Sequence, residues 1–223
     1  MPTHPVRVLE RKREILAAAS RVFRVKGVRG TGMRDVAAAL GMTVGSLYYY
    51  FRNKQELLAF CQEDGLAGLS ELAAFTARLA LPADARLYLL VVGHVERLNE
   101  TTPGSVAHLE IEGLEGEYRA QILARRAAYE AALRALIEEG QAAGVFRPGD
   151  AKIAARAILG ALNWTVKWFR PEGEKSAREI GAEFAQILVS GLLAPGRTLT
   201  LPDLMALPRP EEIPMEKRRW QTA

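Results

Sequence analysis

The chain has 223 residues, of which 49% are hydrophobic and 25% charged, and this balance excludes a disordered polymer and predicts one large or two unequal globular domains. A single cysteine, Cys61, excludes an internal disulfide and fits a reducing compartment. No segment approaches the roughly 20 uncharged apolar residues that cross a bilayer, and the basic first thirty residues lack the apolar run of a signal peptide. We therefore expect a cytoplasmic protein without a membrane partner.

Charge is distributed unevenly along the chain. The first 60 residues hold 11 Lys and Arg against 4 Asp and Glu, whereas the remaining residues hold 19 against 22. A basic segment of this kind is the electrostatic footprint of a protein that binds nucleic acid. The alternative interpretation, which is the commoner meaning of a charge run, is a well-solvated helix face.

The first third of the chain repeats apolar residues at spacings of three and four, which predicts helices over residues 9–26, 33–40, 44–51 and 54–79. Gly27 ends the first helix. Thr31 and Thr43 are expected to cap the second and third helices with their hydroxyls, and Gly41 permits a tight turn between them. Two short helices joined by a glycine turn beside longer helices describe a helix-turn-helix unit. We assign four apolar side chains to its core, namely Phe23, Val36, Leu47 and Phe51.

The rest of the chain is also predicted to be helical. Five further segments carry helical periodicity, over residues 85–99, 105–113, 117–143, 150–170 and 176–193. Frequent prolines beyond Pro195 forbid another long helix. The expected fold is all-α with about nine helices.

Three consecutive tyrosines in the third predicted helix suggest a surface that contacts DNA. Successive helical residues point about 100° apart, so the three rings cannot all be buried. Aromatic and hydroxyl groups beside cations suit phosphates and base edges. The residues predicted to bind DNA are Thr31, Arg34, Thr43, Val44, Gly45, Ser46, Tyr48, Tyr49, Tyr50 and Lys54.

Each type of predicted DNA contact has a stated chemistry and an alternative. Val44 suits a thymine methyl, Ser46 suits either donor or acceptor edges, and Arg34 suits a guanine. Lys54 can pair with phosphate beside a helix N-terminus. As alternatives, Tyr48 packs in the core, Arg34 pairs with a neighbouring acid, and the two threonines act only as caps.

Residues 9–60 closely resemble the DNA-binding domain of the TetR family of bacterial transcription regulators. The resemblance rests on Gly27, Thr31, Arg34-Asp35-Val36-Ala37, Gly41, Thr43, Gly45, Leu47-Tyr48-Tyr49, Phe51, Lys54 and Leu57. Departures at Gly32, Val44 and Tyr50 affect base specificity. The resemblance implies a repressor that a small hydrophobic effector releases from a pseudo-palindromic operator on double-stranded DNA.

The same resemblance implies a homodimer through residues 150–170 and 176–193, which would form a four-helix interface. The first helix carries a stripe of small residues, namely Ala154, Ala157, Gly160 and Ala161, and the second an apolar face of Ile180, Phe184, Ile187, Leu188 and Gly191. The alternative is that both stripes serve the core of the monomer. The expected domains are therefore an arm and helix-turn-helix domain (1–53), an effector-binding and dimerisation domain (54–194), and a proline-containing tail (195–223).

Polar residues on the otherwise apolar middle helices are predicted to line an effector pocket. They are His94, His108, Tyr118, Arg125, Tyr129, Asn163 and Trp164, with Glu110 as a further candidate. The alternative for each is a hydrogen-bonded core residue. Residues 160–173 look like the corresponding stretch in regulators of lipid, steroid and aromatic-acid breakdown, some of which respond to acyl-CoA thioesters, so the implied effector is an acyl-CoA.

Catalysis is not expected. His108 and Glu110 stand two apart, which splays them on a helix instead of converging them on a metal, and no glycine loop for phosphate is present in the sequence. We therefore predict no enzyme activity, no metal site and no cofactor. The rival class is a non-catalytic helical scaffold or a membrane-surface interaction protein, which would not explain the glycine turns and the tyrosines.

Overall fold

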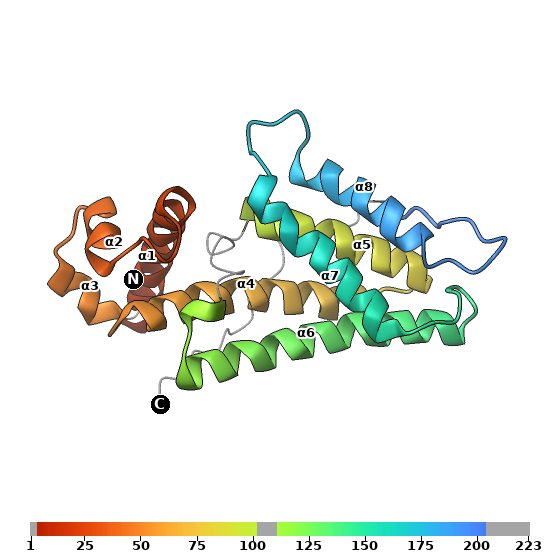
Figure 1. The fold of residues 1–223 in the computed structure, drawn as a ribbon, viewed down its shortest axis with the longest axis horizontal. Helices are drawn as coiled ribbons and strands as arrows, with labels where there is room; N and C mark the ends of the chain where they lie inside the picture. Colours follow the sequence, from red (N-terminus) through yellow and green to blue (C-terminus); the bar gives the residue numbers. More distant parts are fainter. Residues whose placement is uncertain (1–3, 102–110, 204–223) are drawn as a thin grey trace. The chain divides into compact units, whose positions relative to one another are not determined.

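The computed structural model describes residues 4–101 and 111–203, and within these ranges the regular secondary structure is helical apart from one antiparallel bridge between Phe146 and Leu193 (Figure 1). The α-helices are α1 (His4–Lys26), α2 (Met33–Ala39), α3 (Val44–Tyr50), α4 (Lys54–Ala77), α5 (Ala83–Glu96), α6 (Gly116–Ala142), α7 (Ala151–Trp168) and α8 (Ala177–Ser190). A π-helix, η1 (Arg97–Thr101), extends α5, and a 3₁₀ turn, η3 (Ile111–Gly113), precedes α6. The all-α prediction is confirmed, and most of the predicted segment 105–113 lies outside the described residues.

Two compact units divide the chain. The first unit comprises residues 1–65 and 102–126, and the second comprises residues 66–101 and 127–223. Both α4 and α6 contribute residues to each unit. This division differs from the expected boundary at residue 53, which stays a prediction about function.

Glycine turns and one hydroxyl cap delimit the short helices of the first unit. Gly27 follows α1 with a φ of +73°, and Gly41 separates α2 from α3 with a φ of +62°; other residues adopt such values only at a cost. The Thr43 hydroxyl accepts a hydrogen bond from the Ser46 N–H at 3.1 Å, so the predicted cap of α3 is confirmed.

The predicted cap at Thr31 is wrong. Gly32 is the first flanking residue of α2, and the Asp35 carboxylate accepts its N–H at 2.8 Å. The Thr31 side chain is only 2% exposed and donates to the Gly27 carbonyl at 2.8 Å. Gly27 stands in the turn directly after α1, where its carbonyl is beyond the helical ladder, so the Thr31 hydroxyl satisfies this carbonyl instead of capping the next helix.

The core of the first unit is the predicted one. Phe23, Val36, Leu47 and Phe51 are all buried, together with Ile15, Leu16, Leu57 and Leu58. Lys12 places its ammonium 5.0 Å from the centre of the Phe51 ring, a favourable cation–π arrangement. Among the residues of α3, Leu47 is the one that is buried, so a single side chain anchors this helix.

The second unit is built around α5, every residue of which is buried. A Cβ on Gly93 would lie 2.8 Å from Leu72 of α4, and one on Gly181 of α8 would lie 3.0 Å from the Val92 backbone, so both neighbours approach α5 closely. Figure 1 shows α7 and α8 lying along α5, and buried apolar residues of all three helices form one core. The first part of the predicted tail is tied to this unit, since the Thr200 N–H donates to the Asp84 carboxylate at 2.8 Å.

Candidate nucleic-acid interface and effector region

The outer face of α3 carries exposed tyrosines. Tyr49 is 70% exposed and Tyr48 is 48% exposed, so the alternative that Tyr48 packs in the core is wrong. Tyr50 is half-buried, and its ring meets that of Tyr49 edge to face with 5.1 Å between centroids. Because Leu47 holds the opposite side of the helix inside, two phenol groups are available to a partner.

The first turn of α3 offers small and hydroxyl side chains. Thr43, Gly45 and Ser46 are exposed and Val44 is half-buried. The Thr43 and Ser46 hydroxyls lie 2.8 Å apart and share a hydrogen bond. Among the described residues, a Cβ on Gly45 would have only the Thr43 hydroxyl within 4 Å, at 3.9 Å, so none of them obstructs close approach to this turn.

Cations flank the tyrosines within the same unit. Lys54 begins α4 and its ammonium donates to the Arg29 carbonyl at 3.4 Å. Arg34 is exposed and forms no ion pair with any residue in the described ranges, so the alternative of a neighbouring acid finds no support. Lys26 pairs with Asp35 instead. This ion pair, with the Gly32 N–H, lowers the pKa of Asp35 and keeps it ionised where it caps α2.

Thr31 differs from the other predicted DNA contacts. Its hydroxyl is buried and committed to Gly27, so it stabilises the turn between α1 and α2. A side-chain contact between Thr31 and phosphate would require that hydrogen bond to break.

Three of the predicted effector residues meet in the second unit. His94 Nδ1 lies 2.9 Å from the Tyr129 hydroxyl, and His94 Nε2 lies 3.2 Å from the Asn163 side-chain oxygen. Because that oxygen can only accept, Nε2 carries the proton and the Tyr129 hydroxyl donates to Nδ1. Burial lowers the pKa of His94 to about 4, and the nearby charge of Arg97 acts in the same direction. The cluster is therefore uncharged at neutral pH.

The other predicted effector residues do not join this cluster. Tyr118 and Arg125 belong to the first unit, where Tyr118 accepts from Arg52 at 3.5 Å and Arg125 pairs with Glu63 at 3.7 Å. Trp164 is on the surface of α7, with 62% of its area exposed. His108 and Glu110 lie outside the described residues.

Two further buried polar residues beside the His94 cluster, Arg97 and Asn99, were not predicted from the sequence. The Arg97 guanidinium donates to the Gly68 carbonyl of α4 at 3.0 Å. The Asn99 amide donates to the Thr165 hydroxyl of α7 at 2.8 Å. The sequence signal for Arg97 and Asn99 was their polarity within an apolar stretch, three and five positions after His94.

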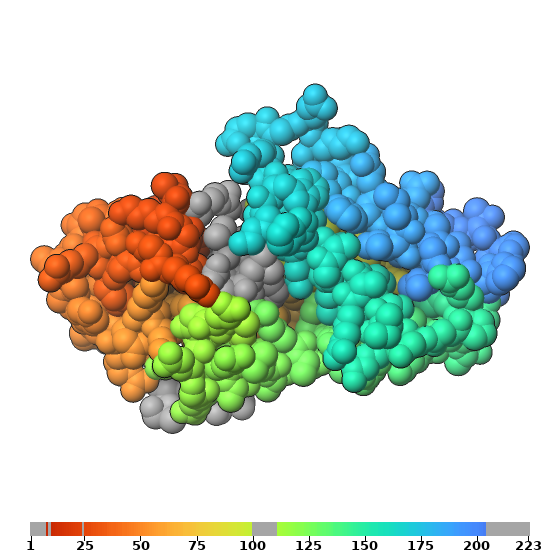
Figure 2. Space-filling model, viewed as in Figure 1, coloured from red at the N-terminus to blue at the C-terminus, as the bar shows by residue number. Residues whose placement is uncertain are grey.

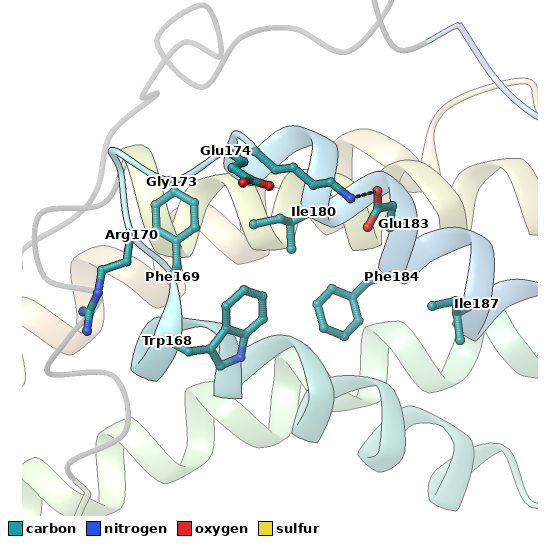
Figure 3. A pocket seen from close by; sticks show the side chains of 10 residues that line it. Trp168, Phe169, Arg170, Gly173, Glu174, Ile180, Glu183, Phe184 and Ile187 are labelled. Atoms are coloured by element: carbon teal, nitrogen blue, oxygen red, sulfur yellow. Dashed lines mark hydrogen bonds and ion pairs between the residues drawn. The ribbon is translucent and has the colours of Figure 1, made fainter.

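A surface pocket of about 470 Å³ lies where the end of α7, the following loop and α8 meet (Figure 3). Its apolar walls are formed by Trp168, Phe169, Ile180, Phe184 and Ile187. The Trp168 and Phe184 rings face each other with 6.2 Å between centroids. None of the predicted effector residues that the structure describes lines this pocket, whereas three of the predicted dimer residues do.

Two further observations concern the described ranges alone. No helix in residues 4–101 or 111–203 is long and apolar enough to cross a membrane. The same ranges hold no group of three or more His, Cys, Asp or Glu side chains placed to bind a metal ion.

Comparison with known proteins identifies the class. Residues 15–60 match the family described as bacterial regulatory proteins, tetR family, and residues 80–192 match the tetracyclin repressor-like C-terminal domain. The second match alone spans half of the chain. The chain belongs to the TetR family of bacterial regulators.

Particular relatives share nearly their whole length with this chain. The TetR family regulator PfmR from Thermus thermophilus is 32% identical, with a TM-score of 0.74 over 82% of this chain and 99% of PfmR. AibR, solved in complex with isovaleryl coenzyme A and operator DNA, is 29% identical, with a TM-score of 0.72 over 83% of this chain and 99% of AibR. The repressor KstR2 of Mycolicibacterium smegmatis is 25% identical over 196 residues, which are 86% of this chain and 95% of KstR2.

Proposed function

We propose that this protein is a cytoplasmic, homodimeric transcriptional repressor that is released from a pseudo-palindromic operator by a small acyl-CoA. The observation that carries the proposal is the outer face of α3, where Tyr48 and Tyr49 are exposed above the single buried anchor Leu47. This face belongs to a glycine-turned, hydroxyl-capped helix in a chain of the TetR family.

The geometry of α3 supports insertion into the major groove, which admits one helix. Gly45 and Ser46 let its first turn approach base edges, and Val44 supplies an apolar contact. Tyr48 and Tyr49 reach phosphates on either side. Lys54 and Arg34 contribute positive charge, which supplies most of the sequence-independent affinity for DNA.

Two copies are needed because one such helix reads only a few base pairs. A two-fold dimer places two recognition helices about one turn of DNA apart, on a pseudo-palindrome. The helices α7 and α8 supply the dimer surface, because both carry exposed apolar side chains, including Trp164 and Ile187.

The proposed effector is an acyl-CoA, and its acyl end is recognised near His94. AibR binds isovaleryl coenzyme A, and its fold over nearly its whole length is similar to this one. The cluster of His94, Tyr129 and Asn163 is buried and neutral, so its hydroxyl and amide suit a thioester carbonyl better than a carboxylate. Release requires that the acyl-CoA bind the DNA-free conformation more tightly than the DNA-bound one.

The test begins with selection of bound fragments from genomic DNA, which yields the operator. Acyl-CoA thioesters of increasing chain length are then titrated into a mobility-shift assay, with coenzyme A and the free acids as controls. We expect thioesters alone to release the operator. Failure of selection would remove the DNA-binding proposal, whereas selection without release by any thioester would remove only the effector class.

A reporter gene under the selected operator tests repression. Expression should be low with the protein present and should rise when the precursor acid is fed. The rival interpretation, a membrane-surface protein, predicts tighter binding to anionic vesicles than to duplex DNA at equal salt.

A further inference from the structure

The exposed side chains on one face of α7 are spaced symmetrically about the middle of the helix, and folding of the monomer does not require this symmetry. Ile153, Ala157, Gly160, Trp164 and Trp168 all lie on one side of this helix, within about 80° of arc, and all are exposed. Ile153 is 60% exposed, Trp164 62% and Trp168 42%. Exposed apolar surface of this extent marks an interaction site.

Gly160 indicates that this face contacts a partner outside the protomer. A Cβ built on Gly160 meets nothing within 4 Å among residues 4–101 and 111–203, so no contact in that part of its own chain requires a glycine there. Glycine weakens a helix interior, and α7 continues for two turns on either side. A residue that costs helix stability without a local benefit is explained by the close approach of another backbone.

The order of side chains along this face is self-complementary when two copies of the helix lie antiparallel. Ile153 and Trp168 lie equally far from the midpoint between Gly160 and Ala161, and so do Ala157 and Trp164. If a second α7 packs antiparallel about that midpoint, each large indole meets a smaller residue of the other copy, Trp164 opposite alanine and Trp168 opposite isoleucine. The two small residues at the centre lie on the axis, where the helices approach most closely.

The pocket beside Trp168 supplies the space that this register requires. Its walls include Trp168, Phe184 and Ile187, so it continues the exposed face of α7 onto α8 (Figure 3). In Figure 2 the outer surfaces of α7 and α8 lie side by side, without any other segment drawn over them.

The charges at the rim disfavour an anionic occupant. Arg170 and Lys175 are balanced by Glu174 and Glu183, and Lys175 is already paired with Glu183. The described lining residues therefore carry no net charge, which offers little attraction to the phosphates of a coenzyme A. An apolar side chain fits the pocket better.

We propose that two copies of this chain pack α7 against α7 antiparallel, about a two-fold axis between Gly160 and Ala161, with Ile153 of the partner subunit filling the pocket beside Trp168. The proposal rests on the homodimer of the proposed function and adds its register and the occupant of the pocket. It also assigns the pocket to dimer contact instead of effector binding.

Cross-linking between two differently tagged, co-expressed variants tests the register. One copy carries Ile153→Cys and the other Trp168→Cys, and a short bismaleimide is added to the purified full-length protein. We expect a covalent dimer that contains both tags. Either variant alone should give none, because equivalent positions on the two helices would lie about 22 Å apart. A second pair, Ala157→Cys with Trp164→Cys, checks the same register nearer the axis.

The native thiol does not interfere with the cross-linking. Cys61 is fully buried, and burial raises its pKa, which keeps it unreactive. Wild-type protein should therefore give no covalent dimer, and the Cys61→Ala background provides a further check.

Gly160→Leu separates dimerisation from folding. Leucine favours the helix and has open space in the monomer, so the melting temperature of the monomer should not fall. The dimer dissociation constant, measured by sedimentation, should rise at least tenfold. Lys152→Leu is the matched control, because Lys152 is exposed on the same helix but off this face, and its dissociation constant should stay within twofold of wild type.

The outcomes separate this proposal from the one that it rests on. A wild-type chain that is monomeric at micromolar concentration would overturn both the homodimer and its register. A stable dimer that fails to cross-link in the mixed pairs, or that tolerates Gly160→Leu, would overturn the register while leaving the homodimer intact.

Discussion

Two surfaces of this protein expose aromatic pairs, and the chemistry around each pair differs. On α3, Tyr48 and Tyr49 follow the hydroxyls of Thr43 and Ser46 and precede Lys54 in the chain; on α7, Trp164 and Trp168 share an exposed face with alanine, glycine and isoleucine. Phenols beside cations suit a hydrated, charged partner such as DNA, whereas indoles beside small apolar residues suit a dry, close-packed one. In the two proposals above, exposure is what the two surfaces share, and the neighbouring side chains distinguish the partner proposed for each one.

The largest expected effect comes from removing the anchor beneath the first surface. Leu47→Ala deletes a fully buried side chain and should cost about 2–5 kcal/mol, concentrated in the helix-turn-helix. Operator binding measured by mobility shift should be lost, while sedimentation should still report a dimer. Leu123→Ala, at a partly exposed site, is the control; loss of the dimer in the Leu47 variant would contradict the assignment of DNA binding and dimerisation to different surfaces.

The second largest effect is expected from acid, which should lower the stability of the second unit. The pKa of His94 is lowered to about 4 in the folded state, while the unfolded value is near 6.5. The unfolded chain therefore binds a proton first, so stability is unaffected above pH 6.5 and falls as the pH drops from 6.5 to 4, by up to about 3 kcal/mol. Chemical denaturation at several pH values measures this loss.

The matched variant for the acid experiment is His94→Gln, which keeps hydrogen-bonding capacity and cannot titrate in this range. Its stability should lose most of the dependence between pH 6.5 and 4. An unchanged dependence would mean that other groups, and not the protonation of His94, are responsible for acid destabilisation.

A smaller effect is expected from the tyrosines themselves. Tyr49→Ala should weaken operator binding at least about tenfold, or about 1.4 kcal/mol, because a hydrogen bond to a charged phosphate is lost. The melting temperature should not change, since the side chain is 70% exposed. Tyr49→Phe keeps the ring and separates the hydroxyl from packing, and wild-type affinity in both variants would remove Tyr49 from the contact surface.

The smallest effect concerns salt. Lys54→Ala should weaken binding to all DNA sequences and reduce the slope of log affinity against log salt concentration by about one for each subunit. Titration at several salt concentrations measures the slope. Lys152→Ala, on the dimerisation helix, should leave it unchanged; equal slopes in all three proteins would contradict a phosphate contact at Lys54.

Much of the fold could be predicted from the sequence, because local chemistry decides it. Gly27 and Gly41 end helices where a positive φ is needed, and Thr43 caps α3 through its own hydroxyl. The cap of α2 was predicted wrongly because two neighbouring residues compete for the role. Asp35 reaches back to Gly32, and Thr31 turns inward to the carbonyl of Gly27, just after α1.

The effector region was less predictable, because one helix, α6, contributes residues to both units and its sequence pattern does not mark where one unit ends and the other begins. Tyr118 and Tyr129 lie on the same helix, α6, yet Tyr118 contacts Arg52 of the first unit and Tyr129 contacts His94 of the second. Polarity on an apolar helix identified both, but only the packing of other helices decides which ones meet. The pocket beside Trp168 depends on the loop after α7, for which the sequence offers no periodic signal.

The single anchor of α3 has a consequence for how such a protein diversifies. Since Leu47 is the one buried residue of this seven-residue helix, the remaining positions tolerate substitution at little cost in folding free energy. If α3 reads the operator as proposed, duplicated copies can acquire new regulatory targets by changing the half-buried residue at 44 or the exposed residues at 46, 48 and 49, one at a time, without passing through unfolded ancestors.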